Sequence, residues 1–265
     1  MKILSLQTPV SENIDENIAV VTKYMGAGCD GTVDLVTLPE MFACPYETKL
    51  FPAYAEEEGG RIWQQCSALA RKYRVYLSAG SIPETDGFCI YNTAYVFNRD
   101  GHCIGKHRKA HLFDIDVPGQ YYKESETLSP GNQATVFDTE FGKMGLCICY
   151  DMRFPELFRA MVAKGAKLVI IPAAFNMTTG PAHWELLIRT RAVDNQVFTV
   201  ATAPARNEKG KYVSWGHSMI AGPWGNVLMQ MDAREGYAIT EINLGDVSKV
   251  RDSMPLLRQR RTDIY

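Results

Sequence analysis

The middle of the chain holds an apolar run that passes directly into polar residues and a proline: Met144-Gly145-Leu146-Cys147-Ile148-Cys149, then Tyr150-Asp151-Met152-Arg153-Phe154-Pro155. The first six residues have the length and character of a buried strand. Proline is typical of the first turn of a helix, because the N–H that it lacks has no helical partner there. The pattern predicts a strand that leads into a helix, with Cys149 at the turn between them.

The same alternation extends in both directions from this point. Further strands are predicted near Ile3–Gln7, Leu35–Pro39, Val75–Ile82, Asn92–Asn98, Leu168–Ala173, Phe198–Thr202 and Ala238–Ile242, and helices near Ser11–Gly26, Gly60–Tyr73, Pro155–Lys164 and Pro181–Gln196. Strands that alternate with helices indicate an α/β protein with largely buried sheets. No repeat, low-complexity segment or linker divides the 265 residues, so we expect a single domain over residues 1–265.

Composition and charge exclude several classes of function. Hydrophobic residues make up 46% and charged residues 22% of the chain, which is ordinary for a folded globular protein. A net charge of −2 offers no electrostatic footprint for nucleic acid or an anionic membrane. The compact cationic cluster Arg258, Arg260 and Arg261 is typical of a solvated or interface-facing tail. We therefore expect neither nucleic acid nor a membrane as a partner.

The cellular compartment is predicted from segments and cysteines. The start of the chain lacks the long apolar stretch and cleavage pattern of a secretory signal. The most continuous apolar segment, Leu168 to Phe175, is far too short to cross a bilayer. Seven cysteines are an odd number, and their spacing follows no small disulfide framework. These features predict the cytoplasm.

Three reactive residues follow predicted strands or lie where one ends. In α/β folds, the groups that do chemistry usually project from loops beyond the carboxyl ends of the strands. Glu40 follows the strand that stops at Pro39, Cys149 lies at the turn, and Lys109 lies in the polar segment His107–Phe113 after an expected hairpin. Each has an ordinary alternative, since such a cysteine is often a small buried hydrophobe, such a glutamate a helix cap, and such a lysine a solvated charge.

The three chemistries complement one another. A thiol needs a base to become the attacking thiolate, and a nearby ammonium both lowers the thiol pKa and holds the oxyanion formed on a carbonyl. Removing one oxyanion donor costs roughly 3 to 4 kcal/mol of transition-state stabilisation. Glu40, Lys109 and Cys149 are therefore the candidate catalytic residues of an enzyme with a covalent thiol step.

Other motifs give weaker signals. Gly26-Ala27-Gly28-Cys29-Asp30-Gly31 spells the dinucleotide pattern, but a helix precedes it and a strand follows, which predicts a helix C-cap and turn instead. Cys147 and Cys149 lack the partners of a tetrahedral metal site. A cysteine–histidine pair stays open, with His111 and His183 as the histidines to test and ring packing or hydrogen bonding as their alternative.

The chain resembles the nitrilase, or carbon-nitrogen hydrolase, superfamily over nearly its whole length. The resemblance lies in the blocks Leu38–Phe42, His107–Phe113 and Cys149–Glu156. Within the superfamily, the chain is similar to the ω-amidase branch at Phe113–Gly119, Glu124–Gly131, Phe175–Glu185 and Arg191–Gln196. The resemblance implies a four-layer αββα sandwich that pairs into a homodimer or a higher homo-oligomer.

The resemblance also implies residue roles. Cys149 becomes the nucleophile, Glu40 the general base, Lys109 an oxyanion donor together with the backbone N–H of Tyr150, and Glu124 a second glutamate that contacts the lysine.

Four residues are candidates for substrate binding. Arg153 is a candidate to hold a substrate carboxylate in a bidentate pair, with an ion pair to Glu156 or another surface acid as the alternative. Tyr46, and the loop from Phe175 to Thr178, are expected pocket walls by resemblance. Tyr150 joins them through its backbone N–H.

The implied activity is hydrolysis of α-ketoglutaramate and α-ketosuccinamate to the 2-oxo dicarboxylate and ammonia, through a thioester on Cys149. No step needs a metal or an organic cofactor, so none is expected. Two alternative functions are compatible with the same fold. One is another amidase of the superfamily, acting on deaminated glutathione or on N-carbamoyl amino acids. The other is a catalytically silent oligomeric binding protein.

Overall fold

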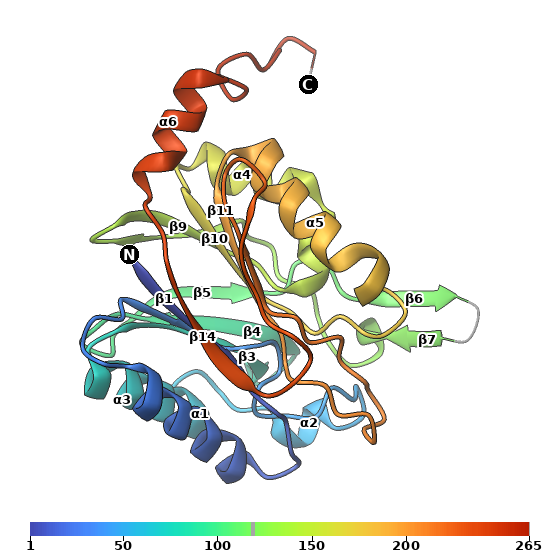
Figure 1. The fold of residues 1–265 in the computed structure, drawn as a ribbon. Coiled ribbons are helices and arrows are strands. Elements are labelled where there is room, and N and C mark those ends of the chain that lie inside the picture. Colours follow the sequence, from blue (N-terminus) through green and yellow to red (C-terminus); the bar gives the residue numbers. More distant parts are fainter. Residues whose placement is uncertain (118–119, 265) are drawn as a thin grey trace.

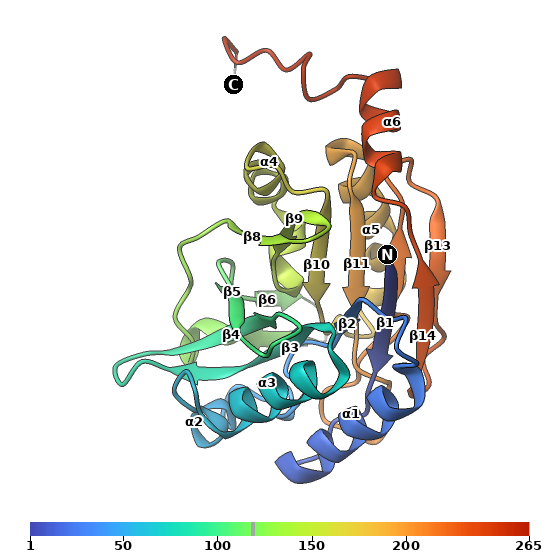
Figure 2. The same ribbon diagram turned by 90° about the vertical axis from the view of Figure 1, so that its left-hand side faces the viewer.

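The computed structural model describes residues 1–117 and 120–264, and it arranges them in four layers (Figures 1 and 2). Two six-stranded sheets pack against each other, and each is covered on its outer face by helices. The prediction of an α/β fold, and of the αββα sandwich, is confirmed. A small two-stranded hairpin stands beside the sheets.

The first sheet has the strand order β14-β1-β2-β3-β4-β5. Its strands are β1 (Lys2–Gln7), β2 (Leu35–Thr37), β3 (Tyr76–Thr85), β4 (Ile90–Phe97), β5 (Cys103–Arg108) and β14 (Gly236–Glu241). β1, β2 and β3 are parallel, while β4, β5 and β14 are antiparallel to their neighbours. Parallel strands place their carboxyl ends at one edge of the sheet, and Glu40 follows one of them.

The second sheet has the order β13-β12-β11-β10-β9-β8. Its strands are β8 (Thr135–Thr139), β9 (Gly142–Leu146), β10 (Leu168–Pro172), β11 (Phe198–Thr202), β12 (Met219–Ala221) and β13 (Val227–Gln230). Its centre is again parallel, since β10 pairs in parallel with both β9 and β11. All five residues of β10 and all five of β11 are buried, as expected for strands covered on both faces.

The helices cover the outer faces of the sheets. α1 (Ile14–Gly28) and α3 (Arg61–Tyr73) lie on the first sheet, and α4 (Pro155–Ala163) and α5 (Gly180–Asn195) lie on the second (Figure 1). The remaining elements are α2 (Phe51–Tyr54), α6 (Gly245–Ser253), the hairpin strands β6 (Asp114–Val117) and β7 (Gln120–Lys123), and the 3₁₀ turns η1 (Glu124–Glu126) and η2 (Cys149–Arg153).

Polar side chains join the two sheets across the middle of the sandwich. The hydroxyl oxygens of Thr37 and Thr202 lie 2.7 Å apart. Gln7 accepts hydrogen bonds from the backbone and hydroxyl of Ser218, and its Nε2 donates to two backbone carbonyls of the second half. Because these groups are buried, a sliding of one sheet over the other would leave them unsatisfied, so they hold the two sheets in register.

The predicted elements match the structure with two kinds of difference. The strand predicted over Met144–Cys149 is wrong at its end, since β9 stops at Leu146 and Cys149 begins a 3₁₀ turn. The strands β8, β12 and β13, the hairpin β6–β7 and helix α6 were not predicted, because short or exposed elements carry little periodic signal. The glycine motif at 26–31 ends α1 and precedes β2, as predicted.

Two further findings concern segments and cysteines. Within the part of the chain that the structure describes, no helix has the length and apolar character needed to span a bilayer. All seven cysteines are free thiols.

Candidate active site

Glu40 lies just beyond β2, where the backbone is held in an unusual shape. Met41 has a φ of 51°, and its backbone N–H donates to the hydroxyl of Ser81 at 3.0 Å. Gly80 has a φ of 61° and lies against the backbone of Pro39. A Cβ on Gly80 would meet the carbonyl oxygen of Pro39 at 2.1 Å. Only glycine allows this approach, and the contact brings the Glu40 segment against β3.

Lys109 follows β5 and is held by backbone hydrogen bonds on both sides. Its N–H donates to the carbonyl of Asn92 at 2.8 Å, and its carbonyl accepts from the N–H of Gly131 at 2.8 Å. A Cβ on Gly131 would meet the carbonyl oxygen of Arg108 at 2.1 Å. The Lys109 side chain is therefore directed from a fixed backbone, and it is fully buried.

Cys149 begins the turn η2 with a φ of 45°, in the left-handed region that a side chain rarely adopts. Asp151 holds this turn, because its Oδ2 accepts the backbone N–H of Ile148 at 3.0 Å. The same carboxylate binds the rings of His107 and His111 at 2.9 and 2.8 Å and the backbone N–H of His111 at 2.9 Å. Asp151 thus links the Cys149 turn directly to the segment that carries Lys109.

The structure brings Glu40, Lys109 and Glu124 into one buried cluster around the lysine ammonium. Lys109 Nζ lies 2.9 Å from Glu40 Oε1 and 2.9 Å from Glu124 Oε2. The Tyr46 hydroxyl donates to Glu124 Oε1 at 2.6 Å, and Asn92 Nδ2 donates to Glu40 Oε1 at 2.8 Å. The second oxygen of Glu124 accepts the backbone N–H of Phe113 at 2.6 Å. The cluster has two carboxylates for one ammonium.

Charge and burial set the protonation of this cluster. Burial by itself would lower the pKa of Lys109, but the charges of Glu124 and Glu40 outweigh it and raise that pKa well above its ordinary value. Lys109 is therefore an ammonium and a donor. Burial raises the pKa of Glu40, the Lys109 charge opposes this, and the charge of Glu124 adds to it, with a net rise. Glu40 is thus a stronger base than a solvated glutamate.

Cys149 is the electrostatic neighbour of Glu40 and Lys109. Burial raises the pKa of the Cys149 thiol well above its ordinary value and the charge of Glu40 raises it further, while Lys109 and the backbone of Ala174 lower it only in part. We expected the ammonium to lower the thiol pKa, and its contribution has that sign but is outweighed. The resting thiol is protonated. Glu40 Oε2 has no hydrogen-bond partner within residues 1–117 and 120–264, so an acceptor is open beside it.

A small cavity of about 10 Å³, room for roughly one water molecule, adjoins the Cys149 turn. The residues that line it come from the turn η2, the loop after β10 and two aromatic side chains: Phe113, Cys149, Tyr150, Arg153, Ala174, Phe175, Thr179 and Tyr212. The predicted residues Tyr150, Arg153 and Phe175 therefore lie together with Cys149. Tyr46 does not line this cavity, and its hydroxyl contacts Lys109 and Glu124.

Arg153 faces this cavity without an acidic partner. Its guanidinium packs over the rings of Tyr150 and Phe175, with centroid distances of 5.5 and 5.0 Å, and lies 3.2 Å from His183 Nδ1. Among the described residues no carboxylate forms an ion pair with Arg153, so the alternative pairing with Glu156 is not present. Burial lowers the pKa of Arg153, and an anionic ligand would offset that cost.

The two histidines considered for a cysteine–histidine pair have other neighbours. His111 binds Asp151 and stacks on Phe154 with ring centroids 3.6 Å apart, and His183 binds Arg153. These are the packing and hydrogen-bonding alternatives stated above. No group of three metal-ligating side chains is found in the described part of the chain.

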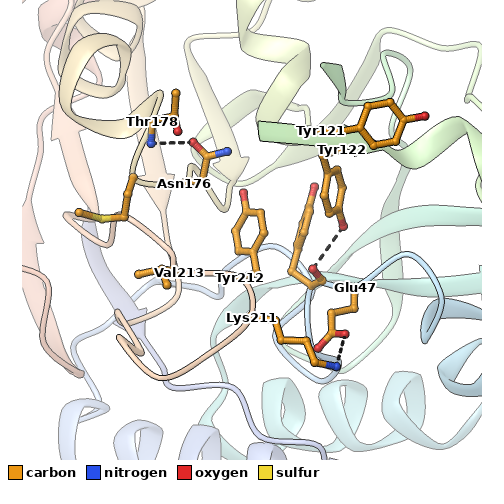
Figure 3. Close-up of a pocket in the computed structure, with 10 residues that line it drawn as sticks. Glu47, Tyr121, Tyr122, Asn176, Thr178, Lys211, Tyr212 and Val213 are labelled. Carbon is orange, nitrogen blue, oxygen red and sulfur yellow. Dashed lines mark hydrogen bonds and ion pairs between the residues drawn. The ribbon is translucent and has the colours of Figure 1, made fainter. Parts of the chain in front are cut away.

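A wider cleft of about 430 Å³ lies outside the small cavity (Figure 3). Tyr212 lines both spaces and separates them, and its hydroxyl donates to the carbonyl of Ala174. The rings of Tyr46 and Tyr212 are 4.6 Å apart, and Lys211 pairs with Glu47 at 2.9 Å on the rim. The cleft and the Cys149 cavity therefore share the Tyr212 side chain as a wall.

Sequence reasoning missed several residues of the site. Tyr212, Asn92 and the pair of Asp151 with His107 were not predicted to take part, because they follow no buried strand or belong to a block read as structural. Their common signal is that each carries a polar group into an apolar surrounding, which only the fold reveals. Residues 118 and 119, used in the resemblance, lie outside the described residues.

Comparisons with known proteins agree with this architecture. A family model for carbon-nitrogen hydrolases matches residues 3–252. The omega-amidase NIT2 of Homo sapiens is 44% identical over 265 residues, covering 100% of this chain and 96% of the relative, and that of Xenopus tropicalis is 48% identical over 261 residues, covering 98% and 95%. The crystal structure of Saccharomyces cerevisiae Nit3, a member of branch 10 of the nitrilase superfamily, has a TM-score of 0.90 at 39% identity, covering 98% of this chain and 96% of that one. The resemblance is confirmed, and this chain belongs to the carbon-nitrogen hydrolase family.

Proposed function

We propose that the chain is an omega-amidase that hydrolyses α-ketoglutaramate and α-ketosuccinamate to the 2-oxo dicarboxylate and ammonia. The relatives named omega-amidase are 44% to 48% identical and match nearly the full chain. The observation that supports the chemistry most directly is the buried Lys109 ammonium between two carboxylates, beside the Cys149 thiol. We propose that residues 1–265 act as one catalytic domain.

The first half of the proposed reaction forms a thioester. Glu40 takes the proton of the Cys149 thiol as the sulfur attacks the amide carbon, and the carbonyl π electrons move onto the oxygen. Lys109 Nζ and the backbone N–H of Tyr150 stabilise this oxyanion. When the oxyanion collapses, the carbon–nitrogen bond breaks and protonated Glu40 delivers its proton to the nitrogen, which leaves as ammonia. The acyl group remains on sulfur.

The second half hydrolyses the thioester. A water molecule occupies the place left by ammonia, and Glu40 accepts its proton as the oxygen attacks the thioester carbon. The same donors hold the second oxyanion. Collapse breaks the carbon–sulfur bond, the proton on Glu40 returns to the sulfur, and the carboxylic acid product is released. Glu124 does not exchange protons in this scheme, and instead holds Lys109 and Tyr46 in place.

The arginine in the cavity supports a substrate that carries a carboxylate. Arg153 has one buried donor without a partner, Nε, and no acidic partner among the described residues, and it lines the same cavity as Cys149. A carboxylate at the far end of the substrate would form a charge-assisted hydrogen bond there. Arg153→Lys is expected to weaken binding of α-ketoglutaramate, because lysine lacks the planar fork of donors.

Two further proposals concern the state of the protein in the cell. We propose a homodimer or a higher homo-oligomer, and an exposed apolar surface around α5 supports it. We propose the cytoplasm as its compartment, which the seven unpaired cysteines support.

Ammonia release is the test of the proposed function. The purified protein is incubated with α-ketoglutaramate, glutamine, deaminated glutathione and an N-carbamoyl amino acid, and the rates are compared. We expect the highest kcat/KM for α-ketoglutaramate, and a loss on the order of 10⁴-fold or more in Cys149→Ala. Cys66→Ala, a buried cysteine on α3 remote from the site, is the matched control and should retain activity.

The other outcomes separate the alternatives. A preference for deaminated glutathione or for the N-carbamoyl compound would assign the chain to another branch of the family. Equal rates in the wild type and in Cys149→Ala would remove the thiol from the mechanism. An absence of ammonia release from every amide would favour the catalytically silent binding protein.

A further inference from the structure

Two buried nitrogen donors near the Cys149 cavity lack an acceptor in the part of the chain that the structure describes. One is Arg153 Nε, and the other is Asn176 Nδ2. Asn176 is only 4% exposed. A buried donor without a partner is costly and uncommon in folded proteins, and it therefore needs an explanation. The proposed mechanism does not use Asn176.

The orientation of the Asn176 amide is determined by its other atom. Asn176 Oδ1 accepts three hydrogen bonds, from the N–H of Thr178 at 3.1 Å, the N–H of Thr179 at 2.9 Å and the Thr179 hydroxyl at 3.0 Å. A flipped amide would place its NH₂ group against the two backbone N–H donors. The oxygen therefore faces the turn that leads into α5, and the nitrogen faces away from it.

The nitrogen faces the wider cleft. Asn176 is among the residues that line this cleft, and Figure 3 shows its amide nitrogen on the side away from Thr178. The cleft meets the Cys149 cavity at Tyr212, which lines both. The free donor thus belongs to a residue of the cleft, which shares the Tyr212 wall with the Cys149 cavity.

The position along the chain gives the distance from the reacting carbon. Ala174, whose backbone lowers the pKa of Cys149, precedes Asn176 by two residues. Two residues span at most about 7 Å. In α-ketoglutaramate, four carbon–carbon bonds of about 1.5 Å each separate the amide carbon from the carboxylate carbon, and three separate it from the 2-oxo carbon. An extended substrate attached to Cys149 is therefore long enough for its oxygens to reach Asn176.

We propose that Asn176 Nδ2 donates a hydrogen bond to an oxygen of the 2-oxo carboxylate end of the substrate, and so determines specificity. The inference rests on the proposed function. A ketone or carboxylate oxygen accepts a hydrogen bond, whereas the 2-ammonium group of glutamine only donates. An ammonium opposite the Asn176 donor would find no acceptor for its hydrogen bonds. The positive charge of the Arg153 guanidinium would also repel it. Glutamine has the same carboxylate, so the site favours the α-keto amide over the amino acid amide through the 2-oxo oxygen.

Asn176→Asp tests this role, because it replaces the NH₂ group by oxygen and keeps the oxygen that caps the turn. We expect kcat/KM for α-ketoglutaramate to fall at least about 10-fold, through KM, since a hydrogen bond to a charged group is lost. Hydrolysis of butyramide, which has neither a ketone nor a carboxylate, should be unchanged. Asn13→Asp is the matched control, because Asn13 also caps a turn through its Oδ1, at the start of α1 and away from the site.

Asn176→Ala distinguishes the two possible acceptors without adding a charge. A loss with α-ketoglutaramate but not with glutaramate, which lacks the 2-oxo group, would assign the ketone oxygen. An equal loss with both would assign the carboxylate. If the wild type is active and Asn176→Asp keeps its KM for α-ketoglutaramate within about twofold, the inference about Asn176 is wrong and the proposed function still stands. If the wild type releases no ammonia from α-ketoglutaramate, the proposed function fails and the inference falls with it.

Discussion

A lysine without contact with solvent is stable only if its charge is paired, and Lys109 is paired twice. Its ammonium touches Glu40 and Glu124, and the Tyr46 hydroxyl completes the coordination of the second carboxylate. Removing one partner of such a group leaves an uncompensated buried charge, which costs about 3 to 5 kcal/mol. The surplus carboxylate keeps Glu40 basic. The same contacts therefore stabilise the cluster and prepare it for proton transfer.

Asp151 carries a prediction about pH at the same scale. Burial by itself would raise the pKa of Asp151, but hydrogen bonds from His107 and His111 lower it below its ordinary value. The ordinary value is about 3.9, and a carboxyl with a depressed folded-state pKa stabilises the fold above that pH. This contribution is lost as the pH falls from about 4 through the lower pKa of the folded state.

We therefore expect Asp151→Asn to reduce the free energy of unfolding at pH 7 by about 1 to 3 kcal/mol for each donor left unsatisfied. The difference from the wild type should shrink as the pH is lowered from 5 towards 3, because Asp151 becomes protonated in the unfolded chain while the folded state keeps it ionised. Urea unfolding at pH 7, 5 and 3.5 measures it. A difference that stayed constant with pH would show that Asp151 acts by shape alone.

At the scale of elements, the loops that follow the strands set the position of the reactive groups. Glu40, Lys109 and Cys149 each lie just beyond a strand. Near each of them, a closely packed glycine or a residue with a positive φ fixes the conformation of the backbone. Backbone in the left-handed region stores strain of about 1 to 3 kcal/mol for residues other than glycine. Met41 and Cys149 carry such strain beside the site, and the contacts around them maintain it.

Gly80→Ala is expected to destabilise the protein and to displace Glu40. Its φ of 61° alone costs about 1 to 2 kcal/mol for alanine, and the added Cβ would meet the carbonyl oxygen of Pro39 at 2.1 Å. Gly87→Ala is the matched control, because Gly87 has a φ of 90° but open space around it. Thermal unfolding and kcat should both fall much further in Gly80→Ala. Equal losses in the two variants would contradict a role for the close approach.

At the scale of the molecule, the two sheets bring together loops that are far apart in sequence. The outer surface also carries exposed apolar side chains. Leu186, Val193 and Trp224 form an exposed apolar surface on and beside α5, which we call the α5 patch, and Leu186 is 63% exposed. Exposed patches of this kind are typical of interaction surfaces. The α5 patch is the surface that we expect to pair two copies.

Leu186→Lys tests this expectation. Because Leu186 is exposed, the substitution should not affect the folding of one chain, but it would place two charges in a symmetric interface. We expect light scattering after gel filtration to show a mass near twice 29.7 kDa for the wild type, and 29.7 kDa for Leu186→Lys. Phe88→Lys, at a residue 98% exposed on the β3–β4 turn, is the control. An unchanged assembly in Leu186→Lys would exclude the α5 patch.

The elements with strong periodicity were predicted closely, and the weak ones were not. β11 was predicted over its observed range, and α3 differs by one residue at its start. The end of β9 was wrong, because Cys147 and Ile148 are as apolar as a strand but already leave it for the turn. β12 and β13 were missed, since three or four residues do not establish a period. Local pattern therefore predicts elements, and packing decides where they stop.

By itself, the sequence determined the α/β class, the alternation of strands and helices, and the positions of Glu40, Lys109 and Cys149 after strands, because hydrophobic periodicity and strand-to-helix turns are local properties. Only the tertiary structure decided that Glu124 and Tyr46 complete the lysine's coordination, that Asp151 links two loops, and that Asn176 has an unpaired donor. These relations join residues up to tens of positions apart, and a pKa or an unsatisfied hydrogen bond depends on every group that burial brings near. Such quantities exist only once the chain has folded.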